Sequence, residues 1–304
     1  MRMVPQARSW AGRIIAPGFW MTAKAGRLDV TDHSRDSAGL RYVYPVVSRR
    51  AGGVSVGINL NPNNACNWRC IYCQVPDLKR GAAPPIDLAR LETELREFIA
   101  LLQHGDFMRS QVPEDARRIV DVAFSGNGEP TSAREFPETV ELAGRVLWDA
   151  GLQEGVRLRL ITNGSLLGRS RVQAGVRLLG DMGGEVWFKV DAGSAEDYRR
   201  INDVDMSPGS VAQRLRLCAG LCPTWVQTCL FALDGQEPTE VGLAAYAAVL
   251  VEAGIANLAG VHLYGLARPS RQPEASRLTS LSEDRLAAIA ERLRALGLKV
   301  NVSP

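Results

Sequence analysis

Three cysteines within eight residues are the part of this sequence best suited to chemistry. The segment Asn61–Val75 reads NPNNACNWRCIYCQV, which spaces the thiols as Cys66-x3-Cys70-x2-Cys73. A structural zinc site normally takes a fourth protein ligand, and no histidine lies nearby. The histidines of the chain are His33, His104 and His262. A four-iron cluster differs from zinc, because three thiolates can hold three irons and leave the fourth open for a ligand.

The cysteine triplet resembles a known signature. Cys-x3-Cys-x2-Cys with an aromatic residue, Tyr72, before the last cysteine is similar to the signature of the radical S-adenosylmethionine (radical SAM) superfamily. The resemblance implies a [4Fe–4S] cluster on Cys66, Cys70 and Cys73, with S-adenosylmethionine bound at its open iron and Tyr72 near the adenine. It also implies reductive cleavage of S-adenosylmethionine to a 5′-deoxyadenosyl radical, which removes a hydrogen atom from an unidentified substrate.

A glycine-rich motif follows at residues 123–132, which read AFSGNGEPTS. Taken alone, this stretch predicts a turn. Placed after the cysteine triplet, it resembles the Gly-Gly-Glu motif of the superfamily, in the SGxGEP form of several branches. The resemblance implies that Gly126, Gly128, Glu129 and Pro130 hold the amino group of S-adenosylmethionine.

Polar residues stand at two further predicted strand ends. Asn163 precedes Gly164 in LITNGSL, which is a normal turn pair, and the resemblance makes Asn163 a candidate contact for the ribose or carboxylate of the cofactor. Lys189 and Asp191 are two residues apart and so share one face of a strand. Two charges inside a barrel are unfavourable unless they pair or bind a ligand. The resemblance implies contacts from Lys189 and Asp191 to ribose and carboxylate, and a salt-bridged or solvated strand end is the alternative.

Other candidates are ordinary in their setting. A second cysteine group lies in apolar helical and strand segments and predicts packing as small buried hydrophobes, although a second cluster stays open; its members are Cys218, Cys222 and Cys229. His262 is a weaker candidate for chemistry, and the catalytic residue is left unassigned. Arg268 and Arg271 follow the last long strand and could bind a phosphate or carboxylate; solvated loop charges are the alternative.

Short β-rich runs that alternate with amphipathic helical patterns must position these motifs. The strand candidates are Val54–Leu60, Ile119–Phe124, Leu158–Thr162, Val186–Asp191, Val226–Leu233, Gly260–Leu266 and Lys299–Val302. Asp87 is expected to cap the helix that follows it, and Ser280 with Glu283 forms a capping box for the last helix. The alternation predicts a parallel sheet with right-handed crossovers, whose chemistry gathers at the C-terminal ends of the strands.

The predicted fold is therefore α/β. Together with the resemblance, the pattern predicts a partial (β/α)6 TIM-like barrel of the radical SAM type over residues 51–304, with a C-terminal helix and a short strand. Residues 1–50 contain prolines at positions 5, 17 and 45 with scattered glycine and mixed charge. We expect them to form an irregular N-terminal extension.

Composition bounds the compartment and the partners. Of the 304 residues 46% are hydrophobic and 23% charged, which is ordinary for a globular protein. No apolar run has signal-peptide or transmembrane length, so we expect no membrane and a cytoplasmic location, where thiols stay reduced. The net charge of +3 does not indicate a nucleic-acid surface, and nucleic acid is an open but not favoured partner. The resemblance implies a reductase such as flavodoxin or ferredoxin as electron donor.

The layout resembles an iron–sulfur oxidoreductase branch that includes wyosine-type tRNA-modifying enzymes and glycyl-radical activating enzymes. A radical SAM enzyme of oxidoreductase or transferase type is the main hypothesis. One alternative is a wyosine-like tRNA-modifying enzyme, although an extra N-terminal cysteine set of the archaeal kind is not evident. Another is a non-catalytic iron–sulfur electron carrier or sensor, against which the GNGEP stretch counts.

Overall fold

A single eight-stranded sheet forms the body of the protein. The computed structural model describes residues 39–48 and 52–304, so that the predicted N-terminal extension up to residue 38 lies outside the described residues. In spatial order the strands are β1 (Val43–Ser48), β2 (Gly53–Ile58), β5 (Ile119–Phe124), β6 (Arg157–Thr162), β7 (Glu185–Lys189), β8 (Thr224–Cys229), β10 (Gly260–Tyr264) and β12 (Val300–Ser303). β1 and β2 are antiparallel, and all other neighbours are parallel.

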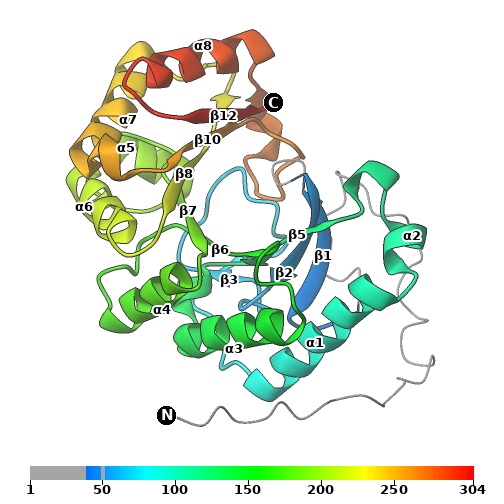
Figure 1. The fold of residues 1–304 in the computed structure, drawn as a ribbon. Helices are drawn as coiled ribbons and strands as arrows, with labels where there is room; N and C mark the ends of the chain where they lie inside the picture. The colour runs from blue at the N-terminus through cyan, green and yellow to red at the C-terminus, as the bar shows by residue number, and fades with distance from the viewer. Residues whose placement is uncertain (1–38, 49–51) are drawn as a thin grey trace.

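A long helix follows each of the six parallel strands from β2 to β10. These helices are α1 (Leu88–His104), α3 (Phe136–Asp149), α4 (Ser170–Asp181), α6 (Pro208–Ala219), α7 (Glu240–Ala253) and α8 (Glu283–Arg294). They lie along the outside of the sheet (Figure 1). This arrangement confirms the predicted α/β fold with six strand–helix units.

Shorter elements of the described chain lie between the long ones, together with four short 3-10 helices at Glu114–Ala116, Pro130–Ser132, Ile255–Asn257 and Ala275–Arg277. The other shorter elements are β3 (Ala65–Cys66), which pairs with β4 (Lys79–Arg80), β9 (Phe231–Leu233), which pairs with β11 (Leu278–Ser280), the short helices α2 (Phe107–Gln111) and α5 (Ala195–Asp197), and a π-helical turn, η3 (Tyr198–Asn202).

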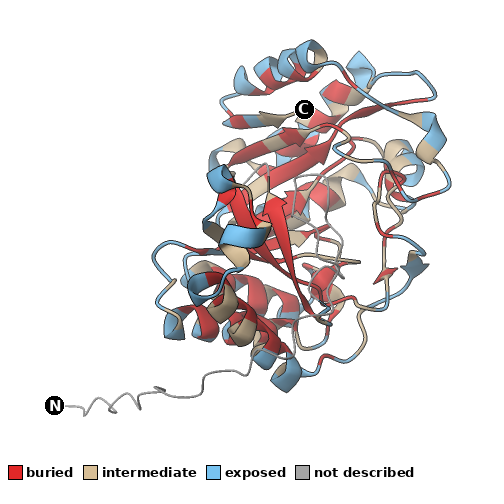
Figure 2. Cartoon of the chain, turned by 90° about the vertical axis from the view of Figure 1, so that its right-hand side faces the viewer, coloured by how far each residue is buried: buried red, intermediate tan, exposed pale blue. Residues whose placement is uncertain are grey.

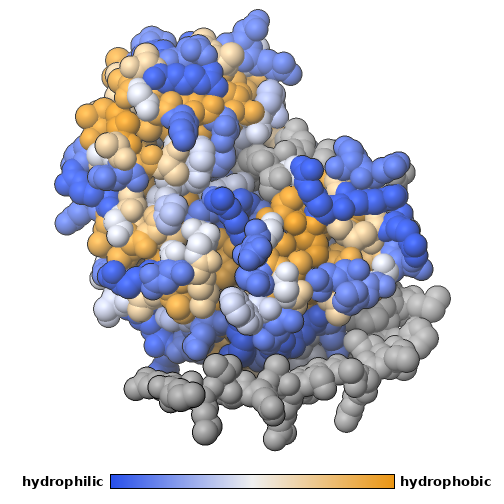
Figure 3. All heavy atoms as spheres, viewed as in Figure 1, coloured by the Kyte–Doolittle hydropathy of each residue, from blue (hydrophilic) through white to orange (hydrophobic). Residues whose placement is uncertain are grey.

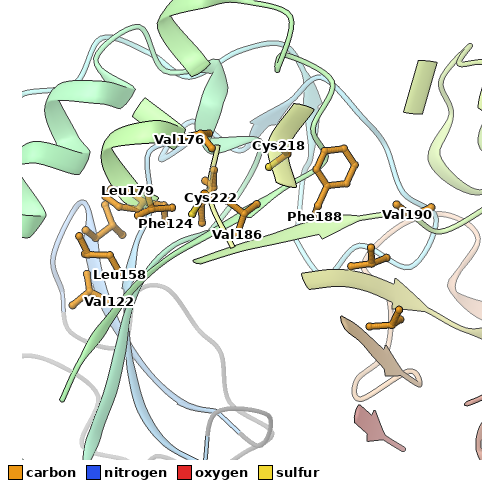
Figure 4. Packing of buried hydrophobic residues seen from close by; sticks show 14 of the residues in the cluster. Val122, Phe124, Leu158, Val176, Leu179, Val186, Phe188, Val190, Cys218 and Cys222 are labelled. Atoms are coloured by element: carbon orange, nitrogen blue, oxygen red, sulfur yellow. The ribbon is translucent and has the colours of Figure 1, made fainter. Parts of the chain in front are cut away.

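The two faces of the sheet carry different residues because side chains alternate along a strand. On β5, Val122 and Phe124 join the apolar core beneath the helices, whereas Asp121 and Ala123 face a cavity on the other side. Figure 4 shows the apolar side, and Figure 2 shows that the strands are buried while the helices expose their outer surfaces. Thus the apolar face holds the fold together and leaves the other face available for a site.

The sheet curls around that cavity. Tyr44 of β1 and Ser303 of β12, from the opposite edges of the sheet, line the same hollow. Within the described residues the two edge strands do not pair with each other. The result is the partial barrel predicted from the sequence.

The first strand departs from the prediction, which made residues up to 50 irregular. Val43–Ser48 instead pairs with β2, and Pro45 stands opposite Val56. Proline has no N–H for a sheet ladder, but an edge strand needs only one side paired, so proline is tolerated there.

Two other local predictions need correction. The predicted strand Val226–Leu233 is interrupted at Leu230, because β9 leaves the main sheet and pairs with β11. The last helix is capped by Ser282, whose Oγ accepts from Arg285 N at 3.2 Å, and not by Ser280. Ser280 is used by the β9–β11 pairing, so it cannot serve as the cap.

The outer surface is mixed in character. Hydrophilic residues gather over the region of α8 and α2, with hydrophobic residues showing between them (Figure 3). Among the described residues, none of the helices combines the length and apolar character that crossing a bilayer demands.

Candidate functional site

A cavity of about 310 Å³ lies inside the curled sheet and contains most of the predicted site. Nine of the site residues predicted from the sequence line this cavity: Cys66, Cys70, Tyr72, Cys73, Gly126, Gly128, Glu129, Asn163 and Lys189. They come from the loops and strand ends at the C-terminal edge of the sheet, as the barrel rule requires. Pro130 and Asp191 stand beside these residues but do not line the cavity.

The cysteine loop runs from β2 to α1 and is closed by main-chain hydrogen bonds. Cys66 lies in β3, opposite Arg80 of β4, and its carbonyl accepts from Gly81 N at 3.0 Å. Further along, Cys73 N donates to Cys70 O at 2.9 Å, which forms a tight turn between the second and third cysteine. These bonds bring all three thiols to one wall of the cavity.

The three thiols are partly buried and unpaired. Burial raises the pKa of Cys66 to about 12 and raises that of Cys70 above its ordinary range. Trp68 N donates to Cys66 Sγ at 3.5 Å, and Asn202 Nδ2 donates to Cys70 Sγ at 3.2 Å. A group that binds these sulfurs must displace their protons.

The donor set fits an iron–sulfur cluster better than a single ion. In the part of the chain that the structure describes, no three His, Cys, Asp or Glu side chains are arranged to hold one metal ion. A mononuclear site needs its donors around one point. A four-iron cluster takes each thiolate on a different iron, and three thiols on one cavity wall suit it.

The glycine-rich loop after β5 packs directly on the cysteine loop. A Cβ at Gly128 would lie 2.0 Å from Ala65 O, and a Cβ at Gly126 would lie 2.5 Å from Asn59 Oδ1. Gly126 also has a φ of +135°, which side chains rarely adopt. Both positions therefore require glycine, because the two loops approach each other too closely for a side chain.

Glu129 is held rigidly at the junction of β5 and β6. Its Oε1 accepts from Thr131 N at 3.1 Å and from the hydroxyls of Thr131 and Thr162 at 2.6 Å, while Oε2 accepts from Asn163 N at 2.7 Å. Burial raises the pKa of Glu129, although these donors oppose that shift. A carboxylate has about four acceptor positions, so Oε2 keeps one for a ligand.

Asn163 belongs to a small amide network on the same wall. Its Nδ2 donates to Asn67 Oδ1 at 2.9 Å, and its Oδ1 accepts from Ser165 N at 3.0 Å. The side chain thus joins the end of β6 to the cysteine loop, in addition to the turn role that the sequence indicated.

Asp191 fixes the polar side chains next to Cys70. It accepts from Tyr72 OH, from Asn202 Nδ2 at 2.9 Å and from Cys229 N at 3.2 Å. Lys189 Nζ lies 3.8 Å from Asp191 Oδ1. Burial would lower the pKa of Lys189, but the neighbouring Asp191 raises it, so Lys189 stays charged. Lys189 and Asp191 therefore form the salt bridge that the sequence left as the alternative, and their contacts to the cofactor stay a prediction.

Tyr72 is fixed between charged and aromatic neighbours. Lys189 Nζ lies 4.9 Å from the centre of its ring, and the ring of Phe231 lies at 5.6 Å. Burial raises the pKa of Tyr72 well above its ordinary value, so its hydroxyl remains a donor.

The inner wall of the cavity is polar. Arg159 pairs with Asp121 and also with Glu185 at 2.8 Å, and Ser55 donates to Asp121. The buried side chain of Gln227 lines the same wall. A packed barrel interior normally holds branched apolar residues, so this wall is suited to a polar ligand.

Three contributors were missed by the sequence analysis or given another role. Asn202 bonds to a predicted cluster cysteine, and Cys229, expected only to pack, lines the cavity as well as packing on Tyr72 and Phe231. Tyr264 accepts from Lys189 Nζ at 3.0 Å. Tyr264 stands two residues after His262, so the two share one face of the predicted strand, and this spacing is the signal that could have found Tyr264. Nothing local marked Asn202.

Of the remaining candidates, Arg268 and Arg271 lie at the cysteine loop, and the others lie away from it. Cys218 and Cys222 are buried among Val186, Phe188 and other apolar residues (Figure 4). His262 stacks on Trp225 with ring centres 4.5 Å apart and lines a second hollow. Arg268 lines the main cavity and donates to Gln74 Oε1 at 3.2 Å, whereas Arg271 is exposed.

A partial barrel with three cysteines in its cavity is the arrangement expected of a radical SAM protein, and comparison with known families identifies the family. The family profile described as the radical SAM superfamily matches residues 60–244. The chain therefore belongs to the radical SAM superfamily, whose members are enzymes that use a [4Fe–4S] cluster and S-adenosylmethionine and need an electron donor and a substrate.

Relatives with similar sequences match only part of the chain. It is 28% identical to "GTPase Obg" of Brachyspira hyodysenteriae over 161 residues, and this match covers 52% of this chain and 20% of that protein. It is 30% identical to "UPF0026 protein" of Helicobacter pylori strain J99 over 159 residues, and this match covers 52% of this chain and 44% of that protein. The chain thus spans less than half the length of these relatives.

Solved structures share the fold. A radical SAM methyltransferase from Sphaerobacter thermophilus has a TM-score of 0.56 at 14% identity, with 86% of this chain and 68% of that chain covered. SuiB of Streptococcus suis, bound to S-adenosylmethionine, has a TM-score of 0.51 at 10% identity, with 84% and 51% covered. At these identities the likeness concerns the fold alone.

Proposed function

We propose that this protein is a radical SAM enzyme whose cluster is held by Cys66, Cys70 and Cys73. The observation that carries the proposal is that these thiols share one cavity with the GNGEP loop and with Lys189. When bound and reduced, the cluster supplies the electron that cleaves S-adenosylmethionine and so generates the radical that removes a hydrogen atom from the substrate.

The residues around the cysteines position the cofactor. The rigid loop of Gly126, Gly128 and Glu129, with Pro130 behind it, receives the amino group, for which Oε2 of Glu129 offers an acceptor. Asn163 contacts the ribose or the carboxylate.

The side chains of Lys189, Asp191 and Tyr72 complete the cofactor site. Lys189 provides positive charge toward the carboxylate, and Asp191 fixes both Lys189 and Tyr72, whose ring faces the adenine. Support comes from the pairing of these side chains, which keeps each in one orientation.

The substrate sits deeper in the cavity, against the wall of Arg159, Asp121 and Gln227. Because Arg159 is already paired with two carboxylates, this wall favours a polar group without a large net charge.

The proposal includes a separate electron donor and a reducing compartment. A reductase such as flavodoxin or ferredoxin supplies single electrons to the cluster. The cytoplasm suits the three cysteines of the loop, because thiols stay reduced there and can bind iron.

Formation of 5′-deoxyadenosine tests the proposal. The purified chain is loaded with iron and sulfide without oxygen, reduced with dithionite and mixed with S-adenosylmethionine, and the nucleoside is quantified by chromatography. We expect the wild-type chain to form it and Cys70→Ala to form none. Cys218→Ala is the matched control, because that thiol lies in the apolar core, and it keeps its iron and activity.

A fully loaded, reduced wild-type cluster that yields no 5′-deoxyadenosine, even with candidate polar substrates present, would contradict the proposal. A cluster whose spectrum does not change when S-adenosylmethionine is added would instead indicate an electron carrier or sensor.

A further inference from the structure

The π-helical turn η3 packs against the part of the cysteine loop that contains Cys70. Ile201 O accepts from Ile71 N at 2.9 Å, and Asn202 O accepts from Arg69 N at 3.1 Å. These two donors are the residues on either side of Cys70. Single π-helical turns within helical segments are frequent at functional sites, and this one is fixed to the loop at both flanks of one thiol.

The side chain of Asn202 reaches the thiol itself. It is fully buried, and its Nδ2 donates to Cys70 Sγ at 3.2 Å and to Asp191 Oδ2 at 2.9 Å. A carboxylate and a thiolate are acceptors only, so the amide nitrogen and not the oxygen must face them. Oδ1 then has no partner in the described structure, which is unfavourable for a buried acceptor. The packing therefore keeps the hydrogen bond from Asn202 Nδ2 to Cys70 Sγ, although it leaves Asn202 Oδ1 without a hydrogen-bond donor.

We propose that Asn202 is a positioning residue that raises the reduction potential of the cluster through its hydrogen bond to Cys70. The inference rests on the proposed function. An N–H donor stabilises the extra negative charge of the reduced cluster, and hydrogen bonds to the sulfurs are among the factors that set cluster potentials. Within the described residues, Asn202 is the one side chain that donates to any of the three thiols.

The contact to Asp191 adds a second effect. By holding Asp191, Asn202 links the sulfur that binds iron to the carboxylate that orients Tyr72 and Lys189. The amide of Asn202 therefore contacts both the sulfur that would bind the cluster and the carboxylate that orients the cofactor-binding side chains.

A redox titration tests the inference. Asn202→Leu keeps similar volume and removes both donors, and its midpoint potential is measured by electron paramagnetic resonance (EPR) after anaerobic loading. We expect the equilibrium constant for one-electron reduction to fall roughly tenfold, which corresponds to a midpoint lower by about 59 mV, with iron content retained.

Asn61→Leu is the matched control. Asn61 is a buried asparagine of the same loop, and its Nδ2 donates to Ala65 O at 2.9 Å and to Ser132 Oγ at 3.2 Å without touching a thiol. Its midpoint potential is expected to equal that of the wild type.

A measurement on the unaltered chain guards against a variant that does not fold. In protein labelled with ¹⁵N-asparagine, electron–nuclear double resonance of the reduced wild-type cluster should show a coupled asparagine nitrogen, and Asn61→Leu should retain it.

The outcomes separate the two proposals. No asparagine coupling in the wild type, an unshifted midpoint in Asn202→Leu, or loss of iron with an unshifted midpoint overturns the role of Asn202 and leaves the proposed function standing. A wild-type chain that loads no cluster overturns both.

Discussion

The loop cysteines and the pair Cys218 and Cys222 differ in their surroundings, although burial raises the pKa of Cys66 and that of Cys222 alike. Burial raises the pKa of Cys66, in the cavity wall, to about 12, and raises that of Cys222, in the apolar core, to about 12 as well. What separates the loop cysteines from Cys218 and Cys222 is the side of the sheet on which they lie, whereas Cys229 of the second group also borders the cavity. The loop thiols face a polar cavity, whereas Cys218 and Cys222 pack beneath helices among apolar side chains (Figure 4). The difference teaches that access and donor geometry, not thiol pKa, mark the functional group.

Replacing one cysteine of each environment by aspartate should give the largest difference in the free energy of unfolding. In the cluster-free protein we expect Cys218→Asp to lower the free energy of unfolding by about 4 kcal/mol, because an unpaired carboxylate would be buried. Cys73→Asp, at the partly exposed cavity wall, should cost less than about 1 kcal/mol. Urea unfolding measures both.

Equal losses of stability in Cys218→Asp and Cys73→Asp would break the comparison, since they would show that both positions exclude water alike. Retention of iron by Cys73→Asp at the wild-type level would count against its assignment as a ligand.

The support of the cysteine loop can be tested at Gly128. Because a Cβ there would lie 2.0 Å from Ala65 O, the loop must shift. We expect Gly128→Ala to lower the free energy of unfolding by about 2 kcal/mol and to reduce iron loading.

Gly168→Ala provides the control, since a Cβ at that position meets open space and should change stability by no more than about 0.5 kcal/mol. If both glycine variants load iron equally well, the close approach of the two loops is not needed to shape the site.

Thiol labelling of the cluster-free protein should give the smallest effect. We expect iodoacetamide to modify the loop cysteines and to leave Cys218 and Cys222 unmodified, as peptide mass spectrometry would show. The thiolate is the reactive form, and since the pKa of Cys66 is about 12, its labelling rate should rise about tenfold per pH unit between about pH 7 and pH 9.

Labelling of Cys222 at the rate of Cys66 in the folded chain would show that burial does not distinguish the groups. Complete labelling of all six cysteines after denaturation is the internal reference.

Local patterns predicted most of the fold. The apolar runs located the parallel strands to within a few residues, and Asp87 caps α1 as expected, with its carboxylate accepting from Arg90 N at 3.0 Å. The cysteine triplet and GNGEP were recognisable because their spacing is contiguous in the chain. Their meeting in one cavity followed from the rule that parallel strands end at the same edge.

The missed features depend on partners far away in the sequence. Asn202 lies 132 residues after Cys70, and no periodicity signals that their side chains meet. Likewise, Pro45 discouraged a strand prediction because its tolerance depends on β1 being at the edge of the sheet. Cys229 was read as packing because an apolar strand does not reveal which of its faces borders a cavity.

The loop after β10 has a consequence for the order in which the protein matures. Cys73 O accepts from Arg271 N at 2.9 Å and from Ser270 Oγ at 3.2 Å, and Gln272 Nε2 also reaches it, at 3.3 Å. Ser270 lies 197 residues after Cys73, a length that a ribosome takes roughly 10 to 40 s to add. During that time the nascent chain holds its cysteines without the segment that fixes their loop, so iron delivered before residues 270–272 emerge meets an unfinished binding site.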